Sequence, residues 1–478
     1  MESCNRQHTI LSRYGGHSFE AATVKKASIR ILRHVWEGVR RQALGNSLDE
    51  SVAFLTANYF ETPEKIVFLG ESVVPARPGD YLKRGELHLE VSPLYISRVL
   101  NVAEDKGSTV IMVHSHPFET GKPEYSMTDD LGEGRTSETI SKCLAKNPPV
   151  GSLLFGQQDA IARAWTGLSK KHVMADVTVL DKNGCQRYHE SSSASALARR
   201  LIDRQVKAFG DRIQDGIESL HVGIVGLGGT GSSVAEQLVR MGIQNITLVD
   251  HDVFEPSNWS RLYGSTLKDA SKKRLKVDIV ASHLQSINPK VTFNSITKSV
   301  MSREVLYSLS SCDFIFSCLD RHAPRAVLNE LSYQCFIPTI DVGVGLTKEH
   351  GGTLGGSIRA TIIGPDLPCL FCQEIVRPDV ITAEHLSPKE YAVRRAEGYA
   401  NDLADNAPSV ISYTTMAASL GLILFLDFMS GKTSDVVSNL LFDLNSKETL
   451  KLRSKVKPDC TCLKRLGAGF RQAFSVAD

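Results

Sequence analysis

The sequence predicts an α/β protein of two domains, an α+β domain followed by a domain built on a doubly wound parallel sheet. A chain of 478 residues exceeds the usual size of one domain. In its second half, apolar strands at 222–225 and 246–249 flank a glycine-rich turn and a helix at 232–241. This strand–helix–strand order is typical of parallel sheets. A low-complexity stretch at 189–195 separates the two halves and predicts a linker.

Composition argues against two kinds of partner. Hydrophobic residues make up 42% and charged residues 23% of the chain, as in soluble globular proteins. A formal charge of +2 gives no reason to expect nucleic acid or an anionic membrane as a partner. The most apolar stretch, Ala417–Met429, is short and contains Asp427, so we expect a buried helix rather than a membrane span. The N-terminus lacks the apolar run of a secretory signal, and a cytoplasmic location is expected.

The first domain is expected to cover residues 1–188. Apolar residues recur at helical spacing over 27–44 and 94–103, which predicts two helices. Short apolar runs at 51–55 and 109–113 predict strands.

The second domain is expected to cover residues 198–478, after a linker at 189–197. It begins with an amphipathic segment at 198–209, which predicts a helix. Three more apolar runs extend the predicted sheet, at 314–316, 338–342 and 358–363.

A histidine pair follows the strand predicted at 109–113. His114 and His116 are two residues apart, so on a strand end both imidazoles point to the same side and can reach one metal ion. Asp129 could add an oxygen ligand from the start of the next helix. Three protein ligands leave a fourth position for water, which is the plan of a catalytic zinc site. Ser126 and Asp129 also fit a helix capping box, in which the serine has no further role.

This pattern resembles the JAB/JAMM family of zinc isopeptidases, whose motif is a distant glutamate, His-x-His-Pro and Ser-x-x-Asp. The resemblance covers about residues 30 to 185 and implies a JAB/MPN-like α+β domain with metallopeptidase activity. It implies that His114, His116 and Asp129 bind a catalytic zinc ion. It also implies that Ser126 stabilises the oxyanion and that the glutamate is the general base.

The glutamate implied by this resemblance is assigned to Glu50, because it opens the strand after the first helix, where the family places it. Glu61, Glu64 and Glu90 are the rival candidates. The segment Phe118–Tyr125 is longer than is common in the family. An inserted loop there could alter substrate choice or cover the zinc.

Four glycines form the turn after the strand at 222–225: Gly226, Gly228, Gly229 and Gly231. Such a turn lets backbone N–H groups approach a phosphate at the positive end of a helix dipole. The glycines fit an NAD(P)-binding turn equally well, with Asp250 as the acidic residue that closes the next strand. Hydride transfer therefore stays open on the glycines alone.

Residues further along the chain favour ATP. ATP needs cations along its phosphates and a carboxylate for magnesium, whereas a dehydrogenase needs neither. The chain supplies both kinds in order: Asp250, Asp252, Asn258, Arg261, Lys276 and Asp320. With the Cys-x-x-Cys that follows, they resemble the ThiF/MoeB family, which is related to ubiquitin-activating enzymes, over about residues 198 to 478. The resemblance implies a Rossmann-like sheet of the ThiF type, with Asp250 at the ribose, Asp252 as a further cofactor-binding residue and Asp320 on Mg²⁺.

The same resemblance assigns three residues to the phosphates: Asn258, Arg261 and Lys276. Lys276 is chosen over Lys272 and Lys273 because it keeps the family's spacing to the Asn-Pro pair at 288–289. Arg204 matches a family element in which an arginine reaches into the ATP site of a partner subunit, which implies a homodimer. A solvated helix face is the alternative for Arg204.

Two cysteine pairs predict a second metal site: Cys369 with Cys372, and Cys460 with Cys462. Four thiolates are enough for a closed, structural tetrahedral zinc site. The second pair departs from the family's Cys-x-x-Cys by one residue, and a redox pair is the alternative. No cysteine lies between Cys372 and Cys460, where family members that form a thioester with their own substrate normally carry one.

Together the two resemblances imply a bacterial-type bifunctional protein. The first domain would trim a ubiquitin-like tail or remove it from targets, and the second would adenylate its C-terminal carboxylate. Sulfur-carrier adenylation for cofactor or thionucleoside synthesis is a second hypothesis, favoured by the missing transfer cysteine. A scaffold with one inactive half is a third. A conjugating enzyme as partner and a role in defence against phage are further expectations.

Overall fold

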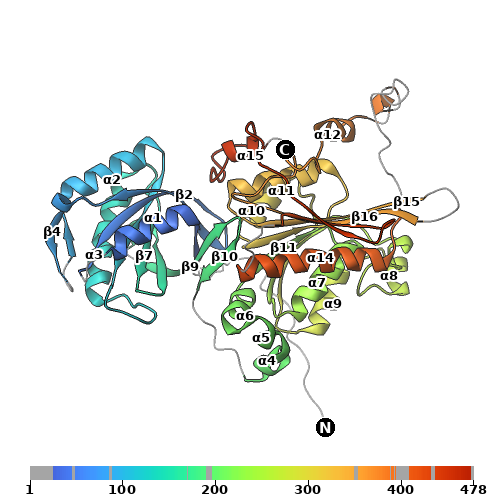
Figure 1. Ribbon diagram of the computed structural model, residues 1–478, viewed down its shortest axis with the longest axis horizontal. Coiled ribbons are helices and arrows are strands. Elements are labelled where there is room, and N and C mark those ends of the chain that lie inside the picture. The colour runs from blue at the N-terminus through green and yellow to red at the C-terminus, as the bar shows by residue number, and fades with distance from the viewer. Residues whose placement is uncertain are drawn as a thin grey trace, which may run out of the picture.

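The computed structural model describes residues 25–45, 49–85, 89–169, 171–189, 196–348, 354–387, 389–391, 393, 408–431 and 437–474. These residues form two sheets with helices around each. In Figure 1 the N-terminal half lies on the left, the C-terminal half lies on the right, and the two meet near β9, β10 and β11.

The first sheet is described by eight strands: β1 (Lys26–Leu32), β2 (Val52–Glu61), β3 (Lys65–Pro75), β6 (Thr109–Ser115), β7 (Val150–Phe155), β8 (Ala160–Trp165), β9 (His172–Asp181) and β10 (Gly184–Tyr188). Their order is β1-β3-β2-β6-β7-β8-β9-β10. Because β1 pairs with both β3 and β9, the sheet closes on itself.

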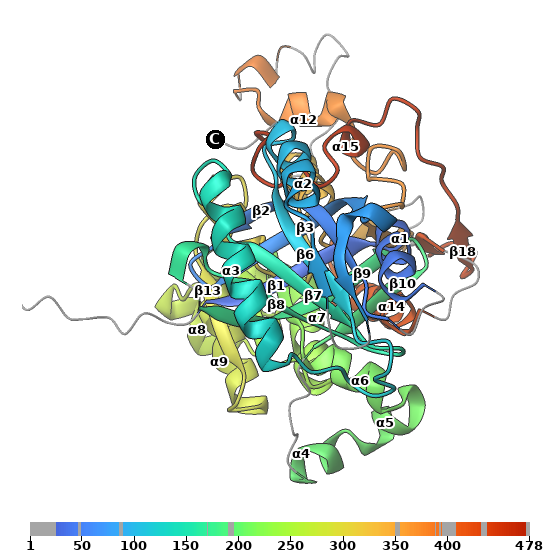
Figure 2. The same cartoon turned by 90° about the vertical axis from the view of Figure 1, so that its left-hand side faces the viewer.

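Three helices and a small hairpin accompany this sheet: α1 (Arg33–Leu44), α2 (Pro93–Asp105), α3 (Met127–Cys143), β4 (Tyr81–Arg84) and β5 (Leu89–Val91). Figure 2 looks onto this half, with α2 and α3 towards the viewer.

The single helix expected over 27–44 is wrong in its first part. Lys26–Leu32 is strand β1, and the helix begins only at Arg33. All residues of β1 after Lys26 are buried, because the strand lies between two neighbours with both faces covered. Ala27, Ile29 and Ile31 alternate with Ser28 and Arg30 as in a strand, but Ile29 and Leu32 also continue the helical spacing of Trp36 in the helix that follows.

The remaining elements expected in the first half are confirmed. The strand at 51–55 belongs to β2, which continues to Glu61, and the helix at 94–103 is α2. The strand at 109–113 is β6, which continues through His114 to Ser115.

The second sheet also contains eight described strands: β11 (His221–Val225), β12 (Asn245–Val249), β13 (Thr292–Ile296), β14 (Phe314–Ser317), β15 (Thr339–Lys348), β16 (Leu354–Ile363), β17 (Asn439–Asp443) and β18 (Thr449–Leu452). Their order is β13-β12-β11-β14-β15-β16-β17-β18. The pairs from β13 to β15 are parallel and those from β15 to β18 are antiparallel.

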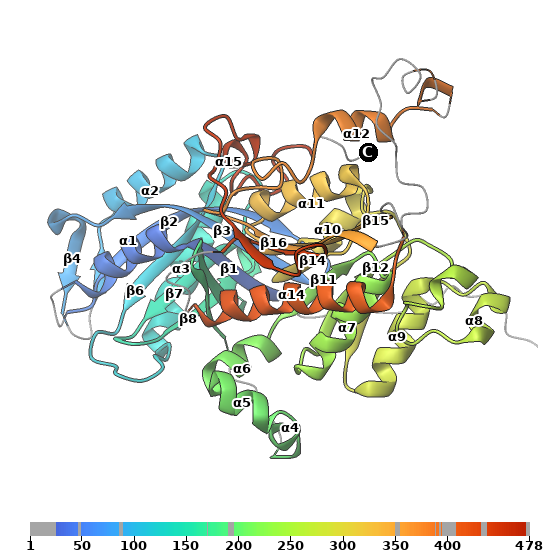
Figure 3. The same ribbon diagram turned by 45° about the vertical axis from the view of Figure 1, so that its right-hand side comes forward.

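Helices cover both faces of the second sheet: α7 (Gly229–Arg240), α9 (Lys276–Ile287), α14 (Ile411–Ser430), α10 (Arg303–Leu309) and α11 (His322–Gln334). Figure 3 shows α7, α9 and α14 on one face and α10 and α11 on the opposite face. The doubly wound α/β sheet expected for this half is therefore confirmed, as are the strands expected within it.

Shorter helices complete the second half: α4 (Ala196–Leu201), α5 (Asp203–Phe209), α6 (Asp211–Glu218), α8 (Leu267–Lys272), α12 (Pro378–Glu384) and α15 (Thr461–Lys464). The helix expected at 198–209 is thus two helices, interrupted at Ile202, whose side chain is buried. Residues 190–195 of the expected linker lie outside the described residues, and the domain boundaries stay a prediction.

The apolar segment at 417–429 lies within α14. Among the described residues, α14 is the helix that has the length and composition of a membrane span, with a mean hydropathy of 1.5, and half of it is buried. Its Phe425 packs edge-on against Phe314 of β14, with ring centroids 4.9 Å apart. The buried face of α14 is therefore part of the core of the second half, as expected.

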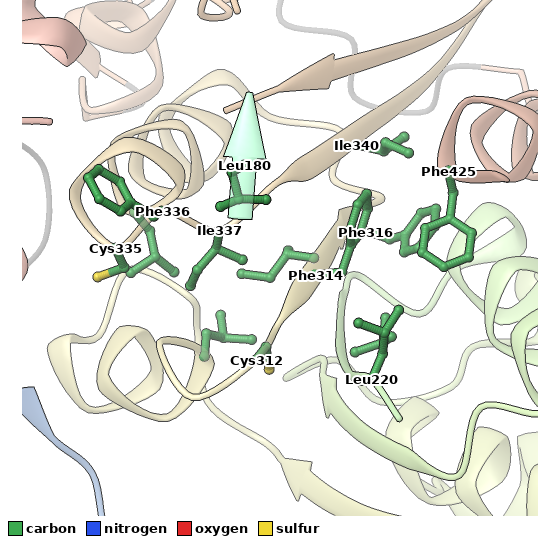
Figure 4. Packing of buried hydrophobic residues seen from close by; sticks show 14 of the residues in the cluster. Leu180, Leu220, Cys312, Phe314, Phe316, Cys335, Phe336, Ile337, Ile340 and Phe425 are labelled. Carbon is green, nitrogen blue, oxygen red and sulfur yellow. The ribbon is translucent and has the colours of Figure 1, made fainter. Parts of the chain in front are cut away.

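The two sheets share one apolar core. Figure 4 shows Leu180 of β9 among residues from the second half that include Cys312, Phe314 and Ile337. Gly184, at the start of β10, lies so close to α14 that a Cβ atom there would come within 2.6 Å of the Phe428 carbonyl oxygen. The halves therefore meet through a close-packed interface.

A buried arginine crosses this interface. Arg30 of β1 is 1% exposed, and its guanidinium donates to three backbone carbonyls of the second half. Nη1 donates to Cys335 O at 2.7 Å, while Nη2 donates to Ser310 O at 3.1 Å and to Cys312 O at 2.8 Å. Burial lowers the pKa of Arg30, and the nearby carboxylate of Asp313 opposes that shift.

Asp313 is the buried counter-charge at this junction. Its Oδ1 lies 3.1 Å from Lys65 Nζ, and its Oδ2 lies 3.5 Å from an Arg187 guanidinium nitrogen. The backbone N–H of His221 also donates to Oδ2, at 3.0 Å. Burial alone would raise the pKa of Asp313, but Lys65, Arg187 and Arg30 hold it well below its usual range.

We predict that Arg30→Met lowers the free energy of unfolding by about 3 kcal/mol, because three buried carbonyls lose charged donors. We also expect calorimetry to resolve separate transitions for the two halves where the unchanged protein has one. Arg41→Met is the matched control, since Arg41 is exposed on α1 and donates to Glu37 O, four residues earlier on the same helix. Equal thermal stability of the two variants would contradict this role for Arg30.

Candidate functional site

The histidines at the end of β6 converge on one aspartate. His114 Nε2 lies 3.2 Å from Asp129 Oδ1, and His116 Nε2 lies 3.5 Å from Asp129 Oδ2. Each residue offers one atom to a group whose members all lie within 4.8 Å of one another. Strands β2 and β7 pair with β6 on either side and hold its end in place. The structure thus places His114, His116 and Asp129 close together, as the sequence predicted.

The chemistry of this cluster fits a zinc ion. His114 Nε2 is buried and makes no hydrogen bond of normal geometry, although Asp129 is near. Burial alone would lower the pKa of His114, but Asp129 and Glu133 outweigh it and raise that pKa to about 9. The carboxylates thus stabilise positive charge at the point where the two Nε2 atoms meet. Two imidazoles and one carboxylate are a ligand set that zinc uses in hydrolytic sites.

Glu50 faces the same cluster. Its side chain is buried, and Oε1 lies 3.7 Å from His116 Nε2. The β4–β5 hairpin fixes its backbone, because Arg84 Nε donates to Glu50 O at 3.1 Å.

The three rival glutamates have different surroundings. Glu61 pairs with Lys25 at 2.8 Å. Glu90 pairs with Lys83 across the β4–β5 hairpin at 3.1 Å. Glu64 lies in the turn between β2 and β3, where its carbonyl accepts from Lys26 N at 3.1 Å. Among these four glutamates, the described contacts to the histidines belong to Glu50.

Ser126 caps helix α3 and lies next to the cluster. Its Oγ accepts from Asp129 N at 3.1 Å and donates to Asp129 Oδ2 at 2.8 Å. The capping box is therefore real, and its aspartate is also the residue that faces the histidines. Burial alone would raise the pKa of Asp129, but the two histidines hold it well below its usual range. Ser126 is exposed, which leaves its hydroxyl accessible.

The segment 118–125 covers one side of His116. The Phe118 ring stacks on the imidazole, with centroids 5.4 Å apart and an interplanar angle of 16°. Glu119 Oε1 lies 3.1 Å from His116 Nδ1. Its backbone is fixed as well, because Gln157 N donates to Glu119 O at 3.0 Å. This loop therefore forms part of the site. The length of the segment suggested such a role in the sequence, but it did not indicate that Phe118 and Glu119 contact His116.

The glycine turn follows β11. Gly226 has a φ of +86°, and a Cβ atom there would lie 2.6 Å from Cys318 O. A Cβ atom on Gly231 would lie 1.8 Å from Gly226 O. These close approaches bring the ends of β11 and β14 and the start of α7 together, and they require glycine.

Asp250 ties the glycine turn to the end of β12. Its Oδ2 accepts from Leu227 N at 2.6 Å, and its Oδ1 accepts from Asp252 N at 2.8 Å. Burial raises the pKa of Asp250, against the opposing effect of Lys276. Lys276 begins α9 and its Nζ lies 2.6 Å from Asp252 Oδ2. The structure therefore groups Asp250, Asp252 and Lys276 beside the turn.

Arg261 and Asp320 also lie at the turn. A Cβ atom on Gly229 would come within 3.1 Å of Arg261 Cγ, so the arginine stem lies against the first turn of α7. Asp320 is exposed two residues beyond Cys318, whose carbonyl contacts Gly226. These residues follow the carboxyl ends of parallel strands, where ligands bind in open α/β sheets.

Further predicted residues lie around this group. Asn258 Oδ1 accepts from Glu255 N at 3.0 Å and closes the short helix Pro256–Asn258. Lys272 and Lys273 are exposed at the end of α8. Arg204 is exposed on α5, in the group of helices that projects away from both sheets in Figure 2. The reach of Arg204 into a second subunit stays a prediction.

A buried charge cluster on β15 was missed by reasoning from the sequence. Asp341 is fully buried, with Arg325 Nε 3.2 Å from Oδ1 and Arg359 Nη2 2.7 Å from Oδ2. Burial alone would raise the pKa of Asp341, but the two guanidiniums lower it. Two arginines for one carboxylate leave positive charge beside the end of β14. The sequence feature that could have indicated this cluster is Asp341, an aspartate within the apolar run at 338–342.

The cysteines predicted to bind a second metal ion also cluster. Cys369 Sγ lies 3.5 Å from Cys372 Sγ and 3.6 Å from Cys460 Sγ. Cys462 is buried in the same cluster, where its Sγ accepts from Asn329 Nδ2 at 3.0 Å. Sulfurs that surround one zinc ion at about 2.3 Å lie about 3.8 Å apart. The buried sulfurs of Cys369, Cys372 and Cys460 all lie within 4.8 Å of one another, so this group fits structural zinc, with Cys462 as the candidate for the fourth ligand.

The chain after this cluster returns to the first half. Residues 465–474, here called the C-terminal strap, lie on α11 and then against β2 and β3. Asn58 Nδ2 donates to Gly467 O at 2.9 Å, and Arg471 Nη2 donates to Gly107 O at 2.9 Å. Phe470 packs against Phe60, with centroids 5.4 Å apart. The cysteine cluster therefore precedes a segment that bridges the two halves.

Taken together, these features define an α/β protein with a glycine turn in its doubly wound half and a separate histidine cluster in its other half. The ThiF family profile matches residues 202–463, more than half of the chain. The chain belongs to the ThiF family.

Curated relatives match parts of the same half. A ubiquitin-like modifier-activating enzyme 5 from Oryza sativa subsp. japonica is 32% identical over 169 residues, 33% of this chain and 38% of that protein. The molybdopterin-synthase adenylyltransferase of Escherichia coli (strain K12) is 28% identical over 160 residues, 33% of this chain and 60% of that protein. The sulfur carrier protein ThiS adenylyltransferase of Bacillus subtilis (strain 168) is 26% identical over 150 residues, 31% of this chain and 42% of that protein. The matches thus span 38% to 60% of these relatives.

Solved structures give a partial likeness. The crystal structure of E. coli MccB with ATP aligns with a TM-score of 0.43 and 18% identity, covering 55% of this chain and 74% of that chain. A crystal structure of PaaA aligns with a TM-score of 0.43 and 18% identity, covering 55% of this chain and 86% of that chain.

We predict that two glycine variants of the turn both lose ATP affinity but differ in thermal stability. Gly231→Ala places a methyl group onto Gly226 O and should abolish ATP binding and lower the melting temperature. Gly228→Ala meets nothing within 4 Å, so the protein should keep its melting temperature while ATP binding weakens by steric contact with phosphate. Thermal denaturation with and without Mg-ATP measures both effects. A Gly231→Ala protein that is as stable as the unchanged protein would contradict the turn geometry.

We further predict that the cysteine cluster binds a metal ion and that loss of this ion loosens the strap. Cys460→Ser should lower the bound metal by one equivalent and increase amide exchange in residues 465–474 and at Gly107. Elemental analysis and hydrogen exchange by mass spectrometry measure these changes. Cys143→Ser is the control, because Cys143 is exposed at the end of α3. Unchanged metal content in Cys460→Ser would rule out this site.

Proposed function

We propose that the C-terminal half uses Mg-ATP to adenylate the C-terminal carboxylate of a ubiquitin-like or sulfur-carrier protein. The observation that carries this proposal is the grouping of Asp250, Arg261, Lys276 and Asp320 around the glycine turn. Family membership and the activities for which the relatives are named support it. A dehydrogenase would have no use for the cations and the extra carboxylate in this group.

In the proposed reaction, a carboxylate oxygen attacks the α-phosphorus of ATP. The bond from the α-phosphorus to the bridging oxygen breaks, so that pyrophosphate leaves and an acyl-adenylate remains. Backbone N–H groups of the turn would contact the phosphates, with Asn258, Arg261 and Lys276 beside them. Asp320 would hold Mg²⁺, and Asp250 the ribose. Positioning and electrostatic stabilisation do most of this work.

We also propose that the N-terminal half is a JAB/JAMM-like isopeptidase for the same kind of tail. A zinc ion held by His114, His116 and Asp129 would supply a polarised water molecule with a pKa of about 7. Glu50 is the general base, which takes a proton from the attacking water and passes it to the leaving amine. The hydroxyl of Ser126, which donates to Asp129 Oδ2, would turn to donate its hydrogen bond to the oxyanion.

The described cysteines of the C-terminal half favour transfer of the adenylate to a nucleophile on another protein. Cys312 and Cys335 are buried, and burial raises the pKa of each thiol to about 12. Burial also raises the pKa of Cys318, beside the glycine turn. A sulfur-carrier role is therefore the second candidate, because it needs no thioester on this chain. A homodimer, with Arg204 completing the partner's site, is part of the proposal.

Incubation with candidate carrier proteins that end in glycine, together with Mg-ATP, tests both halves. We expect carrier-dependent ATP–pyrophosphate exchange, lowered at least about 100-fold by Asp320→Asn, while Asp427→Asn on the exposed side of α14 is unchanged. Tail cleavage should vanish in Glu50→Gln without affecting exchange. A C-terminal thiocarboxylate on the carrier, seen by mass spectrometry, would support the sulfur-carrier role. Absence of exchange with every carrier, together with NAD binding, would overturn the adenylation proposal.

A further inference from the structure

A second carboxylate lies behind the histidine cluster, on the side away from Asp129. Glu133 is on α3, four residues after Asp129, so both side chains are on the same face of the helix. Its Oε1 lies 3.3 Å from His114 Nδ1, while Asp129 Oδ1 lies 3.2 Å from Nε2 of the same ring. The imidazole of His114 is therefore held between two carboxylates, one at each ring nitrogen.

Glu133 is surrounded by hydrogen-bond donors. Arg163 Nε donates to Oε2 at 2.8 Å, and Trp165 Nε1 donates to the same oxygen at 3.2 Å. Ser152 Oγ donates to Oε1 at 2.6 Å. The side chain of Glu133 is only 10% exposed. Donors that converge in this way fix a carboxylate in its ionised, acceptor-only form.

The supporting groups are themselves fixed by packing. The Arg163 side chain is 1% exposed, and its Cζ lies 3.7 Å from the Tyr125 ring centroid and 4.8 Å from that of Trp165. A Cβ atom on Gly134 would lie 3.3 Å from the Trp165 ring, so the helix approaches this ring closely. The position of Glu133 is thus determined by strand β8 as well as by its own helix.

We infer that Glu133 is a positioning residue that makes Nε2 the metal-binding atom of His114. An acceptor-only carboxylate at Nδ1 requires the ring hydrogen on that nitrogen, so the lone pair of the neutral imidazole lies on Nε2. That atom points towards Asp129, where His116 Nε2 also points. This inference rests on the proposed zinc site, and it adds a residue that neither the sequence motif nor the ligand set contains.

His116 has a weaker version of the same arrangement. Glu119 Oε1 lies 3.1 Å from His116 Nδ1, but the Glu119 side chain is 30% exposed and belongs to the loop at 118–125. Glu133 is buried and held by three protein donors, whereas solvent can replace Glu119 at Nδ1. We therefore expect Glu133 to be the more important of the two for metal affinity.

Glu133→Gln tests this role because it preserves shape and reverses polarity at one atom. An amide has one acceptor oxygen and one donor nitrogen. Arg163 and Trp165 both donate at the Oε2 position, so the amide oxygen must take that position. The NH₂ group then faces His114 Nδ1, which has to accept, and the ring hydrogen moves to Nε2. A hydrogen on Nε2 blocks metal binding at that atom.

We expect Glu133→Gln to weaken zinc binding at the histidine site by about 10- to 100-fold. The site is identified as the zinc equivalent lost in His114→Ala, and affinity is measured by competition with a zinc chelator. Glu138→Gln is the matched control, since Glu138 lies on the same helix and pairs with Lys142 at 2.7 Å. Its zinc affinity should equal that of the unchanged protein. The double variant Glu133→Gln/Arg163→Met frees the amide to turn and should recover part of the affinity.

The ¹⁵N spectrum of the histidine rings in the unchanged, zinc-loaded protein gives a second test that does not depend on the folding of any variant. We expect the His114 hydrogen on Nδ1 and the metal on Nε2. Metal on Nδ1, or a folded Glu133→Gln variant with unchanged affinity, would overturn the positioning role while leaving the zinc site intact. If the unchanged protein and His114→Ala bind the same number of zinc ions, the proposed zinc site itself fails.

Discussion

The contact of Arg30 with the second half of the protein is the constraint on which the arrangement of both sites depends. A guanidinium buried in a protein interior is costly unless its donors are satisfied, and here three backbone carbonyls and the nearby Asp313 satisfy it. The carbonyls belong to the segments that lead from α10 into β14 and from α11 into β15. Strand β1 is thereby fixed to the sheet that carries the glycine turn.

This junction has a consequence for how the two sites work together. An interface with a shared apolar core, a buried ion cluster and a bridging strap leaves little freedom for one half to swing against the other. A substrate tail that is processed at the histidine site would therefore have to leave it to reach the glycine turn. Coupling between the proposed activities would come from holding both on one rigid chain, which raises the local concentration of tails.

Both sites use buried charge to orient groups at strand ends. At the histidine site, Glu133 orients a ring through one nitrogen so that the second nitrogen is available. At the glycine turn, Asp250 accepts from two backbone N–H groups and so fixes the loop against the end of β12. In each case a carboxylate that is not expected to react fixes a neighbouring part of the site, the His114 ring at one site and the glycine turn at the other. Rigid support of this kind keeps a site within the small tolerance that catalysis requires.

The sequence by itself determined those features that depend on local spacing. Two histidines at i and i+2 must share one side of a strand, and the capping box placed Asp129 at the start of a helix. Gly226 and Gly231 marked a turn whose close approaches exclude side chains. These patterns predicted the doubly wound sheet and the residues of the proposed metal and nucleotide sites, because each pattern is encoded within a few positions.

Only the tertiary structure decided what depends on residues far apart in the chain. The segment 27–32 has an apolar pattern that suits a helix, and it is a strand because β3 and β9 lie on either side. The partners of Arg30 are about three hundred positions away, and the donor Arg163 lies thirty positions from Glu133. Contacts of that kind depend on how sheets and helices pack against one another. The residues that make them have no regular separation in the sequence, so no sequence pattern predicts them.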